Sequence, residues 1–479
     1  MDAETFRRHA HELVDWIADY YRTVETLPVR AQVRPREVFN RLPEHPPAAG
    51  EPFETIFRDF REIILPGMTH WQHPSFFAYF PANSSPPSVL AEMLTAALGA
   101  QCMSWVTSPA ATELEERVMG WLREMTGLPA SFSGVIQDTA STSTLCAILT
   151  AREVRSGYGV NASGFPAGTT YTVYCSTETH SSVEKAVKIA GLGRENLRKV
   201  AVDSGFALRP DALEQAVLKD RAQGNIPLMV VATLGTTGST AIDPLAEIAA
   251  VRRRYGLWLH VDAAFAGSAL LLPEYRWMIK GIEHADSFVF NPHKWLLTNF
   301  DCSAYFVKDE AALVRTFEIL PEYLRTSEAE RVNNYRDWGI QLGRRFRALK
   351  LWFVVRSYGL EGLQERLREH IRLAHALQER IRSEAGFQVM APVPLSVVCF
   401  RYAPTGRPED SLNALNMELM ERVNRTGKLF LTHTKLNGAV VLRFVVGQTA
   451  VEQRHVEAAW ERIISTAHEM GEPGEPQRR

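Results

Sequence analysis

A lysine and an aspartate, each at the end of an apolar stretch, are the residues best suited to chemistry. Lys294 lies in SFVFNPHKWLL (287–297), and Asp262 lies in LWLHVDAAFAG (257–267). In an open α/β sheet the strand ends face the ligand crevice, so both side chains would reach one flat ligand. A desolvated amine bonds readily to a carbonyl carbon, and a carboxylate beside a pyridine nitrogen keeps that nitrogen protonated. Each residue also has a purely structural interpretation. Lys294 could cap a strand at the protein surface, and Asp262 could cap a helix or form an ion pair with Lys294.

Two further polar segments follow short apolar runs. His180 lies at a predicted strand-to-helix turn in YCSTETHSSVEKA (174–186), where an imidazole would stack on a ligand ring or serve as a capping or core histidine. The segment GVIQDTASTSTL (134–145) places hydroxyl side chains at a predicted helix N-terminus. Backbone N–H groups there suit a phosphate, and helix capping by Ser and Thr accounts for the same residues.

The elements that position these side chains alternate between strands and helices from about residue 89. The predicted strands are 171–175, 197–202, 227–234, 257–262, 287–291 and 303–307. A helix is predicted before them, beginning at Ser108 and Pro109 and ending at Gly127, and helices 209–222 and 243–255 separate strands. This alternation predicts an α/β fold with a mostly parallel sheet covered by helices.

The two ends of the chain show other patterns. An apolar stripe in the first 25 residues predicts a helix that needs a partner surface; its members are Phe6, Ala10, Leu13, Ile17 and Tyr20 or Tyr21. Residues 28–88 are rich in proline and aromatics and predict an extended arm without regular structure, packed against another body such as a second subunit. After residue 350 the pattern predicts a long helix and then a small α+β unit. Its expected elements are strand 387–402, helix 411–426, strands near 428–433 and 439–446, and helix 450–468. The predicted domains are therefore 1–88, 89–350 and 351–479.

Composition excludes several classes of protein. Of the 479 residues 46% are hydrophobic and 23% charged, which is typical of a soluble globular protein. The 53 basic and 55 acidic residues nearly cancel, which argues against nucleic acid or an acidic membrane as partner. A charged N-terminus and the absence of a long apolar stretch favour a cytoplasmic protein without signal peptide or membrane span. Five widely spaced cysteines without a CxxC pair argue against a disulfide framework, and no metal site is predicted.

Taken in order, five segments resemble the pyridoxal-phosphate-dependent group II amino acid decarboxylases, in particular the aromatic-L-amino-acid decarboxylase family. The segments are QDTAS, THSSVEKA, ATLGTT, HVDAAFAG and FNPHKWLL. The resemblance extends over nearly the whole chain, from FRRHAHELVDWIADYY through PGMTHWQHPSFFAYFP and LGRRFRALKLWF to the last helix. It implies the aspartate-aminotransferase-like fold (PLP fold type I), with an N-terminal arm, a mostly parallel central sheet and a small α+β C-terminal domain. It also implies an obligate homodimer with active sites at the interface.

The resemblance assigns roles residue by residue. Lys294 would carry pyridoxal phosphate on its amino group, Asp262 would pair with the ring nitrogen, and His180 would stack on the ring. The other implied cofactor contacts are Thr233 and Ala264, and on the phosphate side Ala140, Ser141, Asn291 and His293. PEYLRTSEAERVNNYRDW (321–338) resembles the family's mobile loop, and Tyr323 falls on its catalytic tyrosine. Tyr323 and His180 together favour simple decarboxylation over oxidative conversion to an aldehyde.

The implied substrate pocket is aromatic. Its residues are Trp71, Tyr79, Phe80, Pro81, Ala82, Gln101, Met103 and Gly343. Ala82 stands where the animal enzymes have a substrate-contacting Thr, and Gln101 and Met103 stand where they have an apolar Ile and Phe. Gly343 resembles the form that tolerates indoles in plant relatives. The expected substrates are dopa, tyrosine, phenylalanine, tryptophan and 5-hydroxytryptophan, because an apolar pocket would leave the polar groups of histidine or glutamate poorly paired.

Three kinds of alternative function compete with this assignment. A pyridoxal-phosphate-dependent aromatic aldehyde synthase or decarboxylation-dependent transaminase would use the same site. A non-catalytic ligand sensor on this fold would need a basic DNA-binding module, which residues 1–88 lack. A nicotinamide dehydrogenase is disfavoured because GLGREN (191–196) lacks the third glycine of the nucleotide-binding motif and follows a helical stretch.

Overall fold

The structure is a computed structural model of the chain, and it describes residues 1–319 and 331–471. The chain divides into two compact units. The first comprises Met1–Pro81, Ala376–Met390 and Cys399–Arg479, and the second comprises Ala82–His375 and Ala391–Val398. The three domain limits expected from the sequence remain a prediction.

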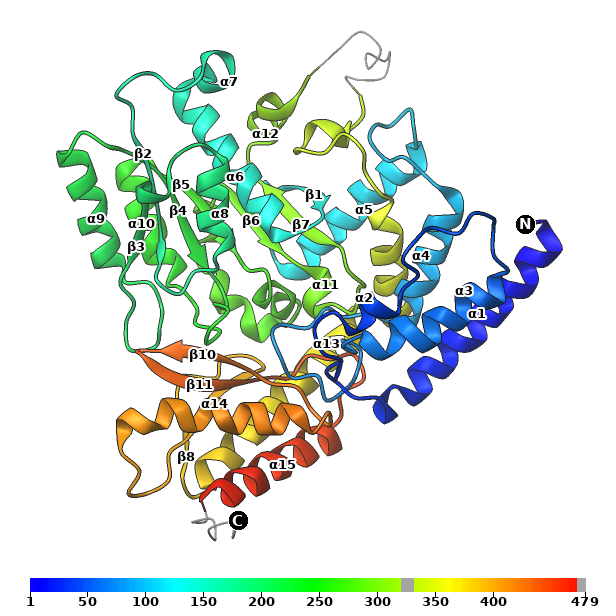
Figure 1. Ribbon diagram of the computed structural model, residues 1–479. Helices are drawn as coiled ribbons and strands as arrows, with labels where there is room; N and C mark the ends of the chain where they lie inside the picture. The colour runs from blue at the N-terminus through cyan, green and yellow to red at the C-terminus, as the bar shows by residue number, and fades with distance from the viewer. Residues whose placement is uncertain (320–330, 472–479) are drawn as a thin grey trace. The chain divides into compact units, whose positions relative to one another are not determined.

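A seven-stranded sheet forms the centre of the second unit, in the order β1-β7-β6-β5-β4-β2-β3 (Figure 1). The strands are β1 (Ser133–Gln137), β2 (Tyr171–Ser176), β3 (Leu197–Val200), β4 (Ile226–Thr233), β5 (Trp258–Asp262), β6 (Ser287–Phe290) and β7 (Ser303–Val307). The run from β3 to β6 is parallel, whereas β7 is antiparallel to both β6 and β1. The mostly parallel α/β sheet is thereby confirmed, and nearly continuous apolar strands such as β4 are what a sheet covered on both faces requires.

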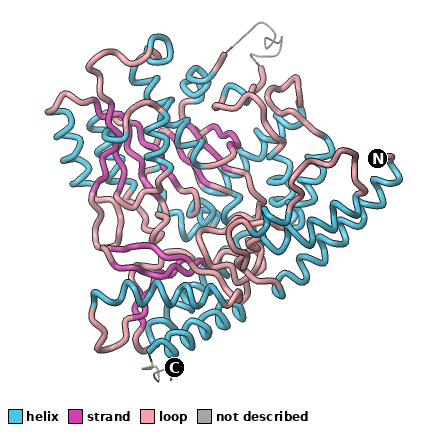
Figure 2. Tube along the Cα trace, in the orientation of Figure 1, coloured by secondary structure: helices cyan, strands magenta, loops and turns pink. Residues whose placement is uncertain are grey.

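Helices surround this sheet (Figure 2). The helices of the second unit up to residue 317 are α4 (Pro86–Leu98), α5 (Pro109–Thr126), α6 (Ala140–Ser156), α7 (Gly159–Ser163), α8 (Ser182–Ile189), α9 (Pro210–Ala222), α10 (Leu245–Tyr255), α11 (Pro292–Trp295) and α12 (Glu310–Phe317), and several of them, such as α5, α6 and α9, pack on the sheet. The predicted ends of α5 are confirmed, because Ser108 is its N-cap and Gly127 ends it in the left-handed conformation. The long helix α13 (Arg347–Ser383) follows, with a kink at Gly359, and its last turns belong to the first unit.

The C-terminal part of the first unit is built on a four-stranded sheet in the order β10-β11-β9-β8. The strands are β8 (Phe387–Val389), β9 (Val397–Tyr402), β10 (Thr432–Leu436) and β11 (Ala439–Val445), accompanied by α14 (Glu409–Arg425) and α15 (Gln453–Gly471). The single strand predicted over 387–402 is wrong. Pro392 and Pro394 have no N–H to donate to a ladder, so the segment splits into two strands.

The prediction that residues 28–88 lack regular structure is also wrong. Besides α1 (Ala3–Thr23), the N-terminal part of the first unit contains α2 (Glu37–Arg41) and α3 (Phe53–Asp59). Its prolines mark helix boundaries, as Pro52 does at the N-cap of α3. The ring centroid of Trp16 on α1 lies 5.2 Å from that of Phe60, just after α3. One side of α1 therefore packs against a later segment of the same chain. Among the described helices, none combines the length and apolarity that crossing a bilayer demands.

Candidate active site

Three residues predicted to act at the cofactor, Thr233, Asp262 and Lys294, lie at or just after the carboxyl ends of β4, β5 and β6. Parallel pairing sets Thr233 opposite Asp262, and Asp262 opposite Val289. Lys294 lies in α11, a short helix that begins two residues after β6 ends. The Asn291 N–H donates to the carbonyl of Ala264 at 3.0 Å, which joins the two turns. These side chains thus share the edge at which open α/β sheets bind ligands.

Asp262 is buried, with 5% of its surface exposed. Its Oδ1 accepts the Ala264 N–H at 3.0 Å. Among the residues that the structure describes, none donates a hydrogen bond to its Oδ2. An ionised carboxylate with one oxygen anchored and the other available suits a protonated ring nitrogen.

His180 is oriented by Ser182. Its Nδ1 lies 2.8 Å from the Ser182 hydroxyl and accepts the Ser182 N–H at 3.2 Å, so the neutral ring bears its proton on Nε2. Loss of hydration lowers the pKa of His180, the Lys294 cation lowers it further, and Asp262 opposes the shift. Lys294 and Asp262 therefore both lie within electrostatic reach of His180. The imidazole still has an exposed side on which a ring can stack.

Thr233 is held by a carboxylate that the sequence analysis missed. The buried Asp243 accepts the N–H of Thr233 at 2.7 Å and that of Leu208 at 2.8 Å. Burial raises the pKa of Asp243 to about 7, although both N–H donors lower it. The Thr233 hydroxyl lies 3.4 Å from that of Thr179, the residue before His180. No local pattern around Asp243 indicates these contacts.

The residues assigned to the phosphate side lie on α6, on α11 and beside β6. Ala140 and Ser141 form the first turn of α6, behind the N-cap Thr139. Asn291 accepts the Ser303 hydroxyl at 2.7 Å, and His293 Nδ1 accepts the Cys302 N–H at 2.9 Å. Burial and then the Lys294 cation lower the pKa of His293 to about 3, so this ring is neutral near pH 7.

Two of the predicted pocket residues of the second unit, Gln101 and Met103, accept backbone hydrogen bonds from a later part of the chain. Gln101 Oε1 accepts the Arg344 N–H at 2.7 Å, directly after Gly343. The Met103 carbonyl accepts the Arg336 N–H at 2.8 Å. Ala82 is half-buried at the start of the unit. Arg344 was not predicted, because its role depends on a contact with the distant Glu115.

The pocket residues of the first unit form their own cluster. Trp71 and Tyr79 stack with ring centroids 5.8 Å apart and an interplanar angle of 20°, and both remain exposed. Phe80 is buried under the Arg443 guanidinium, 5.4 Å from the ring centroid, and Pro81 is buried beside it in the chain. Tyr323, the predicted proton donor, lies outside the described residues.

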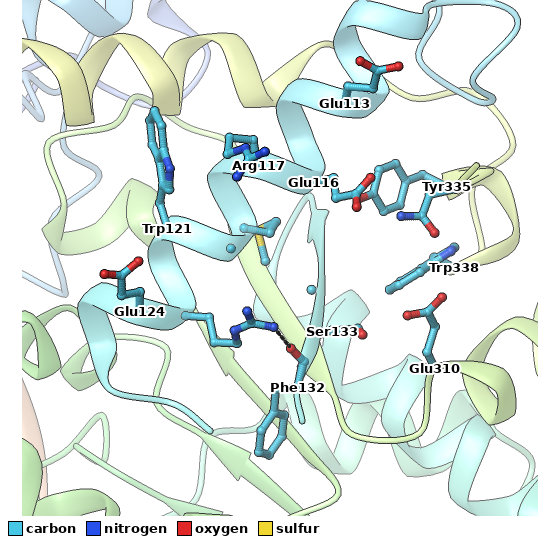
Figure 3. Close-up of a pocket in the computed structure, with 15 residues that line it drawn as sticks. Glu113, Glu116, Arg117, Trp121, Glu124, Phe132, Ser133, Glu310, Tyr335 and Trp338 are labelled. Atoms are coloured by element: carbon cyan, nitrogen blue, oxygen red, sulfur yellow. Dashed lines mark hydrogen bonds between the residues drawn. The ribbon is translucent and has the colours of Figure 1, made fainter. Parts of the chain in front are cut away.

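A cavity of about 580 Å³ in the second unit contains none of the predicted site residues (Figure 3). Four glutamates line it together with arginines and aromatic rings, among them Arg117, Trp121 and Trp338. Arg123 donates to the Phe132 carbonyl at 3.0 Å in its wall. The residues that line this cavity come from α5, β1, α12 and the segment after residue 331. The cavity is therefore distinct from the cluster of residues at the strand ends.

Comparisons with known proteins show what the whole chain is similar to. The pyridoxal-dependent decarboxylase conserved domain matches residues 35–403. Phenylacetaldehyde synthase of Arabidopsis thaliana is 46% identical, with 98% of this chain and 96% of that protein covered. Tyrosine decarboxylase 2 of Narcissus pseudonarcissus is 45% identical, covering 96% and 93%. The structure of Oryza sativa TDC with PLP and tryptamine superposes with a TM-score of 0.94 at 38% identity, covering 98% and 99%.

Proposed function

The chain belongs to the pyridoxal-dependent decarboxylase family, a carboxy-lyase family that uses pyridoxal 5'-phosphate, and from that premise we propose that it decarboxylates aromatic L-amino acids to the corresponding amines. The observation that carries the proposal is that Asp262 ends β5 and Lys294 follows the neighbouring parallel strand β6, with both charges close enough to act on His180. An amine, a buried carboxylate and a neutral ring are what this cofactor needs from a protein.

The chain's own residues fit the cofactor. When bound, pyridoxal phosphate supplies an electron-withdrawing ring that takes up the electron pair left as the Cα–carboxylate bond breaks. Lys294 would hold the cofactor through its Nζ, and the available Oδ2 of Asp262 would keep a proton on the ring nitrogen. His180 would cover one face of the ring, because Ser182 fixes the imidazole through Nδ1. The N-terminus of α6 and the neutral His293 would receive the phosphate.

The substrate class is supported by the aromatic pocket residues of the first unit and by the relatives. The exposed Trp71 and Tyr79 offer stacked aromatic faces in the first unit. The relatives are named for tyrosine decarboxylation and phenylacetaldehyde synthesis. We therefore include dopa, tyrosine, phenylalanine, tryptophan and 5-hydroxytryptophan in the proposed class. Tyr323 remains the proposed donor of the proton that replaces the carboxylate at Cα.

The test is release of CO2 by the purified protein loaded with pyridoxal phosphate. The five aromatic amino acids, L-histidine and L-glutamate are supplied separately. Release from aromatic substrates, and little or none from the other two, is the expected result. Release mainly from histidine or glutamate would overturn the substrate class, and no release from any of the seven would overturn the function.

An aromatic aldehyde synthase is the second candidate, favoured by one observation. A relative 46% identical over nearly the whole chain is named phenylacetaldehyde synthase. Such an enzyme consumes O2 and water and releases aldehyde, ammonia and hydrogen peroxide with the CO2. Assaying peroxide and ammonia beside CO2 separates the two activities, and their stoichiometric formation would move the assignment to the synthase.

We also propose a homodimer. One side of α4 exposes a row of apolar side chains at helical spacing: Leu90, Met93, Leu94 and Leu98, with 53%, 40%, 48% and 66% of their surface accessible. Contiguous exposed apolar patches mark interaction sites, and most soluble oligomers pair the same patch of two copies. A second copy of the chain is the proposed occupant. The cytoplasmic compartment stays a sequence prediction.

A further inference from the structure

We propose that the cavity between α5, β1 and α12 is a second binding site, which takes a protonated aromatic amine. None of the described residues that line it was predicted for the cofactor or the substrate pocket. Its volume of about 580 Å³ is in the range of small-molecule sites. The inference goes beyond the proposed function and does not depend on it, although the proposed reaction would produce amines of this class.

The cavity has an excess of negative charge. Three of its four glutamates, Glu116, Glu124 and Glu310, have no ion-pair partner among the described residues. The Arg123 guanidinium donates to two backbone carbonyls, at 3.2 Å and 3.0 Å. Among the described lining residues the one other cation is Arg117. A positively charged ligand would therefore offset the unpaired carboxylates.

Tyr335 adds a buried polar group close to two of these carboxylates. Its side chain lines the cavity and is 2% exposed, and within the described parts of the chain its hydroxyl has no hydrogen-bond partner. Burial raises the pKa of Tyr335 well above its ordinary value, and nearby carboxylates, including Glu116 and Glu310, raise it further. Figure 3 shows Glu116 beside the Tyr335 ring. The hydroxyl stays protonated, and its oxygen can accept a hydrogen bond from a ligand.

The three groups match an ammonium group. An ammonium has three N–H donors, and Glu116, Glu310 and the Tyr335 hydroxyl supply three acceptors. Hydrogen bonds from a cation to a carboxylate are about twice as strong as neutral ones. Among the described residues, no group of three or more His, Cys, Asp or Glu side chains is placed to hold a metal ion. The chemistry of the cavity therefore favours an organic cation over a metal ion.

Aromatic surface and empty space lie next to these acceptors. Trp338 packs against Tyr335 with ring centroids 5.3 Å apart and an interplanar angle of 64°, and Figure 3 shows it between Tyr335 and Glu310. The Trp338 carbonyl accepts the Gln137 amide at 3.0 Å, which holds this segment against the end of β1. A Cβ added at Gly120, on the α5 wall, would meet nothing within 4 Å. An aromatic ring could pack here while its ammonium group reaches the carboxylates.

The experiment is calorimetric titration of amines into the protein loaded with pyridoxal phosphate and reduced with borohydride. Reduction leaves no aldehyde or imine with which an amine could react. Tyramine and tryptamine should each bind. Two probes test the two halves of the ligand: 4-hydroxyphenylethanol has a hydroxyl in place of the ammonium, and butylamine has no ring. Both should bind at least tenfold more weakly than tyramine, because each loses one kind of contact.

Two variants, each with a matched control, locate the bound amine. Glu310→Gln should weaken tyramine binding about tenfold, since it removes a charge-assisted hydrogen bond. Its control is Glu247→Gln, another glutamate in the first turn of a helix of this unit. Gly120→Leu should fill the empty space and abolish detectable binding. Gly159→Leu is its control, because a Cβ at this other helical glycine also meets nothing within 4 Å. Both controls should bind tyramine as the wild type does.

Three results would overturn the inference. They are no binding of either aromatic amine to the wild type, binding that survives both Glu310→Gln and Gly120→Leu, and equal losses in the variants and their controls. Each of them leaves the proposed decarboxylation untouched, because CO2 release measures that activity separately. If CO2 release fails instead, the proposed function falls and the titration still decides whether this cavity binds aromatic amines.

Discussion

Single buried histidines around the candidate site are kept neutral by the fold. His260 on β5 is completely buried, and its Nδ1 lies 2.9 Å from the Ser287 hydroxyl. Burial lowers the pKa of His260 to about 4, with Asp262 opposing the shift. Because the unfolded chain takes up this proton near pH 6.5, the loss of stability begins there and is complete near pH 4. The cost at pH 4 is about 3 kcal/mol for this one residue.

The His260→Gln variant tests this assignment, since glutamine keeps a hydrogen-bonding group without the titration. The free energy of unfolding is measured in urea from pH 7.5 to pH 4 for both proteins. As pH falls, the wild type should lose about 3 kcal/mol relative to the variant. His11→Gln, at an exposed position of α1, serves as the control. A difference between wild type and His260→Gln that does not change with pH would contradict the assignment.

Between elements, one buried ion pair joins segments that are remote in sequence. Glu115 on α5 accepts the Ile136 N–H of β1 at 2.9 Å and the Arg344 guanidinium at 2.5 Å. Arg344 also lies over the Tyr335 ring, 4.9 Å from its centroid. α5, β1 and two later loops therefore meet at this pair, which also supports Gln101.

We expect Glu115→Gln to destabilise the second unit by about 3 to 5 kcal/mol, because it leaves a buried guanidinium without its carboxylate. The neighbouring Glu116→Gln is the matched control, since Glu116 is exposed on the same helix and should change stability by less than about 1 kcal/mol. Urea unfolding of both variants is the measurement. Equal stability of the two variants would show that the buried pair does not tie these elements together.

Strands and site residues differed in how far the sequence could predict them. β2, β4, β5 and β7 were found because buried strands are uninterrupted apolar runs between polar breaks. α3 was missed because its aromatic spacing is short and flanked by prolines. Lys294, Asp262 and His180 each end or follow such a run, which local patterns reveal. Asp243 and Arg344 act through contacts with residues distant in sequence, and no local pattern encodes those.

For the molecule as a whole, the exposed apolar face of α4 predicts assembly of two copies. Leu94→Glu should convert the protein from a dimer to a monomer of 53.8 kDa, measured by light scattering, because a charge in a buried interface remains unpaired. Leu218→Glu on α9 is the control, since Leu218 is 49% exposed and Leu94 is 48% exposed. A monomeric wild type would contradict the dimer, and a dimeric Leu94→Glu would remove α4 from the interface.

Lys294 is proposed to hold the cofactor through a covalent bond, and borohydride reduction followed by peptide mapping detects that bond. The protein loaded with pyridoxal phosphate is reduced, digested and analysed by mass spectrometry. The predicted result is one pyridoxyl group per chain, on the peptide that contains Lys294, and none on that peptide in Lys294→Ala. Stoichiometric labelling of another lysine in the wild-type protein, or no label at all, would contradict this role of Lys294.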